Sequence, residues 1–329
     1  MAHGGGGRLM QQLIAGMFRS AFDPGGLGHQ HDGEFLDDLA PRSVFTTDSF
    51  VVHPLFFPGG DIGKLAVDGT VNDLAMCGAR PVALSASFII EEGLEMETLW
   101  RVVDSMRREA AAVGVAIVTG DTKVVERGKG DGLFINSAGI GAVEHGRLIA
   151  PQSVRTGDAI ILSGDIGRHG IAVMAARAGL ELETTIISDC APLWEPVRSL
   201  LNAGVEVHCL RDLTRGGLGS ALVEIAGTTG KHLHFEEALI PVAEEVQAVC
   251  ELLGFEPLYV ANEGRFIAFV AANDAERAVQ LLRSSEVSAG VRIVGEARDT
   301  PRGRVTMRSL MGTDRIVEML SGEQLPRIC

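Results

Sequence analysis

Apolar and polar residues follow two different periods along the chain, and the changes of period predict the order of helices and strands. Apolar residues at helical spacing predict helices over residues 8–18, 62–76 and 96–113. Short apolar runs bounded by turn-forming or polar residues predict strands over residues 43–53, 82–90, 115–119 and 133–143. Residues 21–40, rich in Gly, Asp and His, are predicted as a loop. The first half of the chain therefore has a βαβ-like alternation.

The same kind of alternation restarts after a connector at residues 146–157. Strands are predicted over residues 159–163, 205–210, 265–270 and 291–296. Helices are predicted over residues 171–177, 192–203, 219–227, 243–253 and 275–284. The predicted fold class is α+β with two consecutive domains. We divide the chain into a glycine-rich N-terminal segment (1–40), an N-terminal domain (41–155), a C-terminal domain (156–310) and a tail (311–329).

Composition narrows the class of protein. The chain has 329 residues, of which 46% are hydrophobic and 22% charged, as in globular proteins. Its net charge of -14 disfavours binding to nucleic acid, and no run approaches the ~20 apolar residues of a membrane span. The N-terminus does not resemble a secretion signal. Five widely spaced cysteines argue against a disulfide framework or a structural zinc site. We expect a cytoplasmic enzyme or adaptor.

Several acidic residues occupy positions that are unusual for carboxylates. Asp48 interrupts an apolar strand, Asp121 directly follows another, and Asp61 precedes a helix that also carries Asn72 and Asp73. Buried carboxylates without partners cost several kcal/mol, whereas carboxylates grouped around Mg²⁺ become ligands. The alternative is that Asp61 caps the helix and the others lie on exposed faces. For Asp61 alone the cap is favoured; for Asp48 and Asp121 both interpretations remain open.

Glycine-rich turns precede several predicted helices. They lie at residues 4–7, 59–60, 164–170 and 216–217. Backbone N–H groups at a helix start attract phosphate, and glycine lets the phosphate approach closely. None of these turns matches the Walker A or dinucleotide fingerprint. Together with Lys64 and Lys123 they indicate a polyphosphate ligand, although glycines most often only turn the chain.

Two further positions carry candidate chemistry. The run Arg211-Asp212-Leu213-Thr214-Arg215-Gly216 opens a predicted helix, for which Asp212 or Thr214 is an adequate N-cap. Glu263 precedes an apolar strand and is either a turn residue or, if desolvated, a general base.

The sequence closes on a cysteine. Residues 322–329 can span roughly 25 Å when extended, enough to carry the Cys329 thiol into a pocket elsewhere on the protein or on a partner. Pro326 stiffens this tail and Gly322 can act as its hinge. Chain ends are often frayed and without function, which is the alternative interpretation.

Six segments of the sequence resemble one known family. They begin at Thr47, Gly60, Gly69, Gly120, Arg211 and Gly322, and read TDSFVV, GDIGKLA, GTVNDLAM, GDTKVV, RDLTRGG and GEQLPRIC. In this order they resemble the HypE family of hydrogenase maturation proteins, within the aminoimidazole ribonucleotide synthetase-like (PurM-like) superfamily. The resemblance covers essentially the whole chain, and the closing Pro-Arg-Ile-Cys is its most specific element.

The resemblance implies a fold and an activity. The fold is a pair of PurM-like α+β domains, with the N-terminal sheets of a homodimer forming a barrel beside the ATP sites. The C-terminal cysteine receives a carbamoyl group from the carbamoyltransferase HypF. ATP, with Mg²⁺, then phosphorylates the thiocarboxamide oxygen, and elimination leaves a thiocyanate, the source of the cyanide ligands of [NiFe]-hydrogenase. The HypC-HypD scaffold complex is a further implied partner.

The resemblance also assigns roles to individual residues. The implied catalytic residues are Cys329, Lys123, Glu263 and Asp73. The implied metal or phosphate ligands are Asp48, Asp61, Asp73 and Asp121. The implied nucleotide-binding residues are Lys64, Asp61, Gly60, Asn72, Gly120, Thr122, Asp212 and Gly216. Residues 4–7 with Arg8 resemble a lid over ATP, and the tail is expected to place Cys329 near Lys123 and Glu263 when it points inward.

Two other classes of function compete with this one. A selenophosphate synthetase or a thiamine-phosphate kinase has the same fold, but the former is expected to carry a reactive cysteine in its N-terminal segment, and the first cysteine here is Cys77. A non-catalytic adaptor would instead dock its cysteine tail into a partner metallocentre. ATP hydrolysis that depends on carbamoylation separates enzyme from adaptor.

Overall fold

The computed structural model describes residues 8, 11, 34–36, 42–178, 186–322 and 327–329. Arg8 and Gln11 are helical, as predicted, while the rest of the helix predicted at 8–18 and the expected lid at residues 4–7 lie outside this description.

The N-terminal half forms a five-stranded mixed sheet of order β1-β2-β7-β5-β6. Its strands are β1 (Glu34–Leu36), β2 (Ser43–Phe50), β5 (Arg80–Glu91), β6 (Ala116–Val125) and β7 (Leu133–Ala142). A small hairpin of β3 (Phe56–Phe57) and β4 (Gly60–Asp61) precedes the first long helix. Strands β5 and β6 are parallel and are joined by helix α4, which is the crossover that a parallel pair requires.

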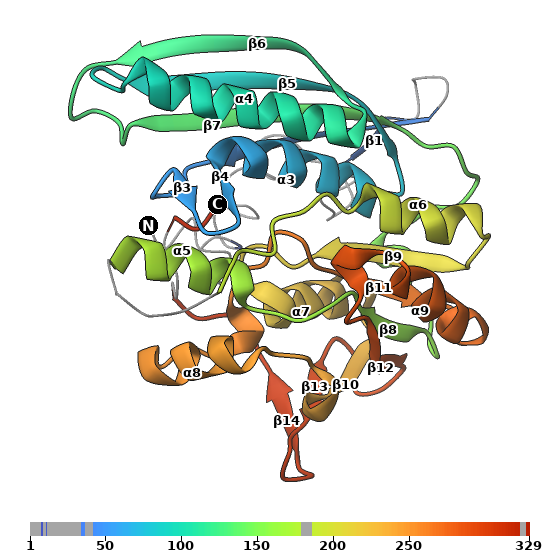
Figure 1. The fold of residues 1–329 in the computed structure, drawn as a ribbon. Helices are drawn as coiled ribbons and strands as arrows, with labels where there is room; N and C mark the ends of the chain where they lie inside the picture. The colour runs from blue at the N-terminus through green and yellow to red at the C-terminus, as the bar shows by residue number, and fades with distance from the viewer. Residues whose placement is uncertain (1–7, 9–10, 12–33, 37–41, 179–185, 323–326) are drawn as a thin grey trace.

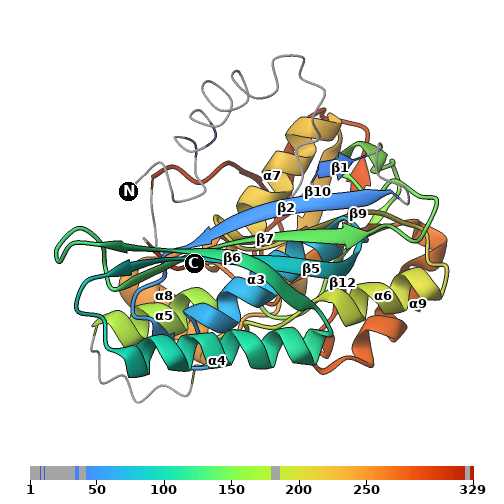
Figure 2. The same ribbon diagram turned by 90° about the horizontal axis from the view of Figure 1, so that it is seen from above.

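Helices α3 (Ile62–Met76) and α4 (Met96–Val113) lie on one face of this sheet (Figures 1 and 2). Both have the predicted bounds. Helix α3 is apolar on nearly all sides, and 13 of its 15 residues are buried. Helix α4 is amphipathic and buries Val102, Ser105, Met106 and Ala110, spaced as one helical face. On the other face of the sheet, no described helix packs, and Phe45 and Ile140 are exposed.

The C-terminal half contains a seven-stranded sheet of order β14-β13-β10-β12-β8-β11-β9. Its strands are β8 (Ala159–Leu162), β9 (Val207–Asp212), β10 (His232–Glu236), β11 (Phe266–Val270), β12 (Arg292–Arg298), β13 (Val305–Arg308) and β14 (Asp314–Val317). The helices are α5 (Arg168–Ala178), α6 (Trp194–Asn202), α7 (Gly217–Thr229), α8 (Glu244–Leu253) and α9 (Ala275–Arg283). Short 3-10 helices connect several of these elements.

Three parts of the predicted secondary structure need correction. Residues 34–36, predicted as loop, form β1, and residues 232–236, 305–308 and 314–317 are strands that the hydrophobic pattern did not predict. The stretch 314–317 pairs with β13, so part of the predicted tail belongs to the C-terminal sheet. Strand β6 was predicted to end at residue 119 but continues to Val125 through Gly120. A Cβ at Gly120 would lie 1.9 Å from the Ala86 carbonyl oxygen, so this glycine permits close strand packing rather than a turn.

The two halves meet across α3, which lies between the N-terminal sheet and the C-terminal half (Figure 1). One hydrophobic core contains residues of both halves, including Leu74 of α3, Val197 of α6 and Leu210 of β9. The buried side chain of Asn72 joins them by hydrogen bonds: its Nδ2 donates to the Ala191 and Glu263 carbonyls, and its Oδ1 accepts from the Leu193 amide. Among the described helices, none has the length and apolarity needed to cross a membrane.

Candidate active site

Four of the predicted acidic residues converge where the two halves meet. Asp48 comes from β2, Asp73 from the last turn of α3, Asp212 from the end of β9, and Glu263 from the loop before β11. Strand β2 packs on α3, and α3 packs on β9, which brings these elements together. Asp212 and Glu263 are buried, at 5% and 3% exposure, whereas Asp48 and Asp73 are partly exposed.

Hydrogen bonds fix the orientation of this acidic cluster (Asp48, Asp73, Asp212 and Glu263). The Thr46 hydroxyl donates to Asp73 Oδ2 at 2.7 Å, and the Ser49 amide donates to Asp48 Oδ1 at 2.7 Å. The Glu263 backbone is held on both sides, because its carbonyl accepts from Asn72 and its amide donates to Asp189 Oδ1. Asn72, implied as a nucleotide-binding residue, is therefore occupied here in holding Glu263 in place.

Burial and mutual repulsion shift the protonation of the acidic cluster. Burial raises the pKa of Asp73, and the nearby Asp212 and Asp48 carboxylates raise it further. Burial also raises the pKa of Glu263 well above its ordinary value, again with a contribution from Asp212 and Asp48. The pKa values of Asp48 and Asp212 are raised for the same first reason, and Arg215 opposes the shift in both. Such a cluster favours the arrival of a cation or a proton.

The C-terminal cysteine lies at this cluster. The Val51 amide donates to the Cys329 carboxylate at 3.0 Å, and Ile328 is 4% exposed within the core that joins the two halves. Burial raises the pKa of the Cys329 thiol to about 12, with Arg215 opposing and with Glu263 and Asp48 adding to the shift. Burial lowers the pKa of Arg215, but the negative charges of Cys329, Asp48 and Asp73 raise it more. The thiol is thus held among carboxyl groups and one guanidinium.

A second group of predicted residues lies at the start of α3. Asp61 is the N-cap: its Oδ1 accepts from the Gly63 and Lys64 amides, which confirms the capping interpretation. Lys64 Nζ is 2.9 Å from Asp68 Oδ2 and 2.8 Å from Glu109 Oε2, so both carboxylates neutralise it here. Gly60 packs against Phe57, whose ring a Cβ would approach to 2.8 Å.

The third group lies on β6 and is separated from the acidic cluster. Gly120, Asp121, Thr122 and Lys123 are exposed, and Lys123 Nζ is 2.8 Å from Asp121 Oδ2. In the strand registers Asp121 shares a row with Ser49, whereas Asp48 shares the next row with Gly120. Adjacent rows point to opposite faces of a sheet. Asp48 therefore faces the helices, Asp121 faces the open side, and within one subunit the four predicted metal ligands do not meet.

The acidic cluster has the oxygen ligands of a divalent-cation site but not the closed geometry of one. In the part of the chain that the structure describes, no three His, Cys, Asp or Glu side chains are already arranged as a metal site. Asp212 Oδ1 and Glu263 Oε1, however, are buried oxygens without a hydrogen-bond partner. Buried acceptors without a donor are rare, and oxygen ligands of this type suit Mg²⁺. Asp48 and Asp73, both partly exposed, can complete such a site.

Four residues of the site had no role in the sequence interpretation. Arg215 was present in a quoted motif without a function, while His169, Arg177 and Asp131 gave no signal because they approach the tail only in the folded chain. Their contacts with residues 327–329 are described below. Gly216 begins α7 with a left-handed backbone (φ +74°), which suits glycine and turns the chain directly after Arg215.

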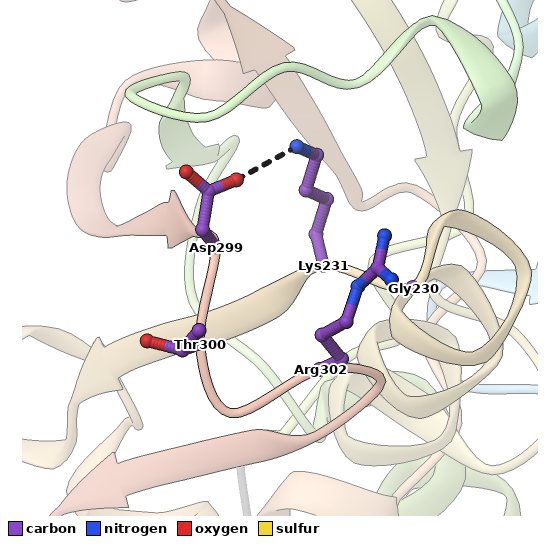
Figure 3. Close-up of a pocket in the computed structure, with 5 residues that line it drawn as sticks. All are labelled: Gly230, Lys231, Asp299, Thr300 and Arg302. Carbon is purple, nitrogen blue, oxygen red and sulfur yellow. Dashed lines mark hydrogen bonds and ion pairs between the residues drawn. The ribbon is translucent and has the colours of Figure 1, made fainter.

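A separate cavity of about 260 Å³ lies at the far end of α7 (Figure 3). It is lined by Gly230, Lys231, Asp299, Thr300 and Arg302. Lys231 Nζ is 3.0 Å from Asp299 Oδ1, as the dashed line shows, and donates to the Thr156 hydroxyl as well. The length of α7 puts this cavity roughly 20 Å from the acidic cluster, so it takes no part in the candidate active site.

Comparisons with known proteins agree with this arrangement. The N-terminal domain of AIR synthase related proteins matches residues 36–143, and the C-terminal domain of the same family matches residues 155–308. The chain is 50% identical to the carbamoyl dehydratase HypE of Rhodobacter capsulatus, covering 100% of this chain and 97% of that protein.

Two solved structures are also similar. A HypE-HypF complex superposes with a TM-score of 0.89 at 44% identity, covering 94% of this chain and 99% of that one. A HypE in complex with ATP superposes with a TM-score of 0.86 at 44% identity and 98% coverage of both chains. Both predicted PurM-like domains are confirmed.

Proposed function

Because the chain belongs to the HypE family of carbamoyl dehydratases, among the AIR synthase related proteins, we propose that it dehydrates its own S-carbamoylated Cys329 to a thiocyanate at the expense of ATP. The thiocyanate supplies the cyanide ligands of [NiFe]-hydrogenase. The observation that carries this proposal is the Cys329 thiol held among Asp48, Glu263 and Arg215. A chain end that served only to stabilise the fold would give no reason to place a thiol among charged side chains.

The proposed reaction has two steps whose atoms balance. ATP transfers a phosphoryl group to the carbonyl oxygen of the thiocarboxamide, releasing ADP and one amide proton. The C–O bond then breaks, phosphate leaves, and the second amide proton is lost as the C≡N bond forms. Glu263 is the proposed proton acceptor, since burial raises the pKa of its carboxyl group and thereby its basicity. Arg215 is placed to balance the negative charge that develops beside the thioether.

The proposed cofactor is Mg²⁺ and the proposed phosphoryl donor is ATP. Asp48, Asp73 and Asp212 would hold the metal, which supplies charge neutralisation for the phosphates. Gly60, Asp61 and Lys64 at the start of α3, Asn72 near its other end and Gly216 at the start of α7 remain proposed nucleotide-binding residues. Asp61 and Lys64 would have to exchange their present partners, Ser105 and the Asp68–Glu109 pair, to reach phosphate.

The open face of the N-terminal sheet supports the proposed homodimer. Phe45, Val82, Ile89 and Ile140 are between 43% and 45% exposed on it, and an apolar patch of this kind is typical of an interface. Asp121 and Lys123 lie on the same face. In a dimer Asp121 and Lys123 would contribute to the active site of the second copy. Gly120 and Thr122, which lie on the opposite face of β6, remain proposed nucleotide-binding residues.

Further proposals concern the partner proteins, the cellular location and the domain limits. We propose that HypF carbamoylates Cys329, in keeping with the HypE-HypF complex that the chain resembles. Delivery of the cyano group to a HypC-HypD scaffold and a cytoplasmic location remain proposals, as do the domain limits at residues 41 and 155.

Mass spectrometry of the C-terminal peptide tests the proposal. Full-length protein is incubated with HypF, carbamoyl phosphate and Mg·ATP, and the mass of the Cys329 peptide is followed with time. We expect the carbamoyl adduct first and the thiocyanate afterwards. Cys329→Ala should form neither product but still bind ATP, whereas Cys77→Ala serves as the matched thiol control and should behave as wild type. Thiocyanate formation without ATP, or in Cys329→Ala, would refute the proposal.

A further inference from the structure

The last three residues are held by hydrogen bonds to their backbone and to the Arg327 side chain. Residues 327–329 run beside residues 51–53, where the Val51 amide donates to the Cys329 carboxylate and the His53 amide donates to the Arg327 carbonyl at 3.4 Å. The chain end is therefore attached to the continuation of β2, the strand that carries Asp48. This attachment sets how far the thiol reaches into the acidic cluster.

The side chain of Arg327 is bound in a way that only a planar guanidinium allows. Its Nε and Nη2 donate to the Val51 carbonyl at 3.2 and 3.1 Å, while its Nη1 forms an ion pair with Asp131. Lysine has a single donor group at the end of a flexible stem and cannot make both contacts at once. Asp131 lies in the turn between β6 and β7, where its carbonyl accepts from the Leu133 amide at 3.0 Å.

The backbone of Arg327 has φ +53°, and it is the one non-glycine residue with positive φ among the described residues. A residue with a Cβ pays roughly 1–2 kcal/mol for this conformation, so the surroundings must offset it. The ion pair with Asp131 and the two hydrogen bonds that Arg327 donates to the Val51 carbonyl offset this cost. If either is removed, the tail should leave the site far more often.

Two buried or partly buried side chains bind the tail carbonyls. Arg177 Nη2 donates to the Arg327 carbonyl at 2.6 Å, and its Nε also holds the His53 carbonyl at 2.9 Å. His169 Nε2 lies 2.9 Å from the Ile328 carbonyl, and its Nδ1 lies 2.8 Å from the Ser188 hydroxyl. A carbonyl only accepts, so His169 carries its proton on Nε2 and the Ser188 hydroxyl donates to Nδ1. Burial lowers the pKa of His169, which keeps this neutral form.

We propose that Asp131, Arg177 and His169 are positioning residues for the dehydration, forming a tail dock that recognises the Arg-Ile sequence before the reactive cysteine. Asp131 recognises the guanidinium, Arg177 the Arg327 carbonyl and His169 the Ile328 carbonyl, while the core takes up the Ile328 side chain. The inference rests on the proposed function only in that the docked thiol is the one that reacts. Occupancy of the dock itself can be measured without ATP and without the dehydration reaction.

The test is the alkylation rate of Cys329 by iodoacetamide in full-length protein without ATP, followed by mass spectrometry. The other four cysteines are buried and serve as internal references. Docked, the thiol has a pKa of about 12 and reacts slowly; released, it should return toward an ordinary value and react faster. A charge-assisted hydrogen bond contributes 1.5–3 kcal/mol, so Asp131→Asn and Arg327→Lys should each speed alkylation roughly ten- to a hundredfold.

Two comparisons separate recognition from a general loss of structure. Cys329 should be alkylated more slowly in the charge-swapped double variant, Asp131→Arg with Arg327→Glu, than in either single variant. It should also be alkylated more slowly in His169→Gln, which keeps a donor, than in His169→Ala. Arg80→Ala, which breaks the exposed Arg80–Glu144 pair, is the matched control and should react as wild type. Unchanged alkylation in Asp131→Asn and Arg327→Lys would overturn the proposal, as would additive effects in the charge swap.

A second measurement distinguishes failure of the dock from failure of the proposed function. With carbamoylated protein and ATP, Asp131→Asn should slow thiocyanate formation in a single turnover while ATP affinity stays unchanged. If wild type forms no thiocyanate but the alkylation pattern holds, the function is wrong and the dock stands. If thiocyanate forms at the wild-type rate in Asp131→Asn, the dock does not position the thiol.

Discussion

Replacing Asp73 by asparagine should change the stability of the protein and its use of nucleotide in opposite directions. Asp73 is partly buried at the end of α3 beside Asp48 and Asp212, and burial and these two charges raise its pKa. Asparagine keeps the oxygen that accepts from Thr46 but removes the negative charge. The variant should therefore lose a repulsion without losing a hydrogen bond.

The magnitude and the pH dependence follow from the direction of the pKa shift. A single substitution that relieves a like-charge repulsion commonly yields roughly 0.5–2 kcal/mol, and Asp73 is partly exposed, so we expect a gain of about 1 kcal/mol. In a chain of this length that is a rise in melting temperature of about 2 °C. The unfolded carboxyl ionises at lower pH than the folded one, so wild type loses stability as pH rises through this window. The advantage of Asp73→Asn should be small near pH 4 and larger near pH 8.

Addition of Mg·ATP should reverse the order of stability. A ligand that binds the folded state stabilises it in proportion to its affinity, and wild type should bind Mg·ATP at least tenfold more tightly, a difference of about 1.4 kcal/mol. The assay is thermal unfolding with and without Mg·ATP at both pH values, beside single-turnover thiocyanate formation. Asp104→Asn, on the surface of α4, is the control and should shift neither. A less stable Asp73→Asn variant, or one with normal nucleotide use, would refute the reasoning.

Two further predictions concern other buried polar residues. Hydrogen bonding to Asp158 raises the pKa of His208 against the effect of burial. The stabilising contribution of His208 is therefore complete below the pKa of the unfolded residue and is lost as pH rises through the folded pKa. His208→Gln should cost more unfolding free energy at pH 6 than at pH 8, and an equal cost at both would contradict this. Asn72→Ala leaves the Leu193 amide without its acceptor and removes two donated bonds, so urea denaturation should show a loss of about 3 kcal/mol, whereas Asn72→Asp, which keeps the acceptor, should lose less.

The sequence predicted local structure well where one period dominates. Helices α3 and α4 have the predicted bounds because their apolar spacing, the Asp61 cap and the glycines that follow them act within a few residues. The end of β6 was predicted at residue 119 and not at Val125, because the sequence does not distinguish a glycine that permits close strand contact, such as Gly120, from one that ends a strand. Strand β14 was missed because its polar residues are placed by pairing with β13 and not by a hydrophobic pattern.

For the candidate site, too, the sequence indicated individual residues but not which of them meet in the fold. Asp48, Asp73, Asp212 and Glu263 were predicted individually, but their meeting depends on how α3 packs between the two sheets. Asp121 was predicted to join Asp48, and strand register places them on opposite faces. Asp131 could not be predicted as a partner of the tail, since 196 residues separate it from Arg327 and only the fold brings them together.

The position of α3 limits how this chain can be cut and recombined. The helix is encoded in the first half, yet its surface is completed by α6, β9 and the segment that accepts from Asn72 in the second half. An isolated first half would expose much of α3 to water and should aggregate or unfold. Chimaeras that exchange halves between relatives should fold only when α3 and the second-half residues that contact it come from the same relative. Neither half can therefore be exchanged alone.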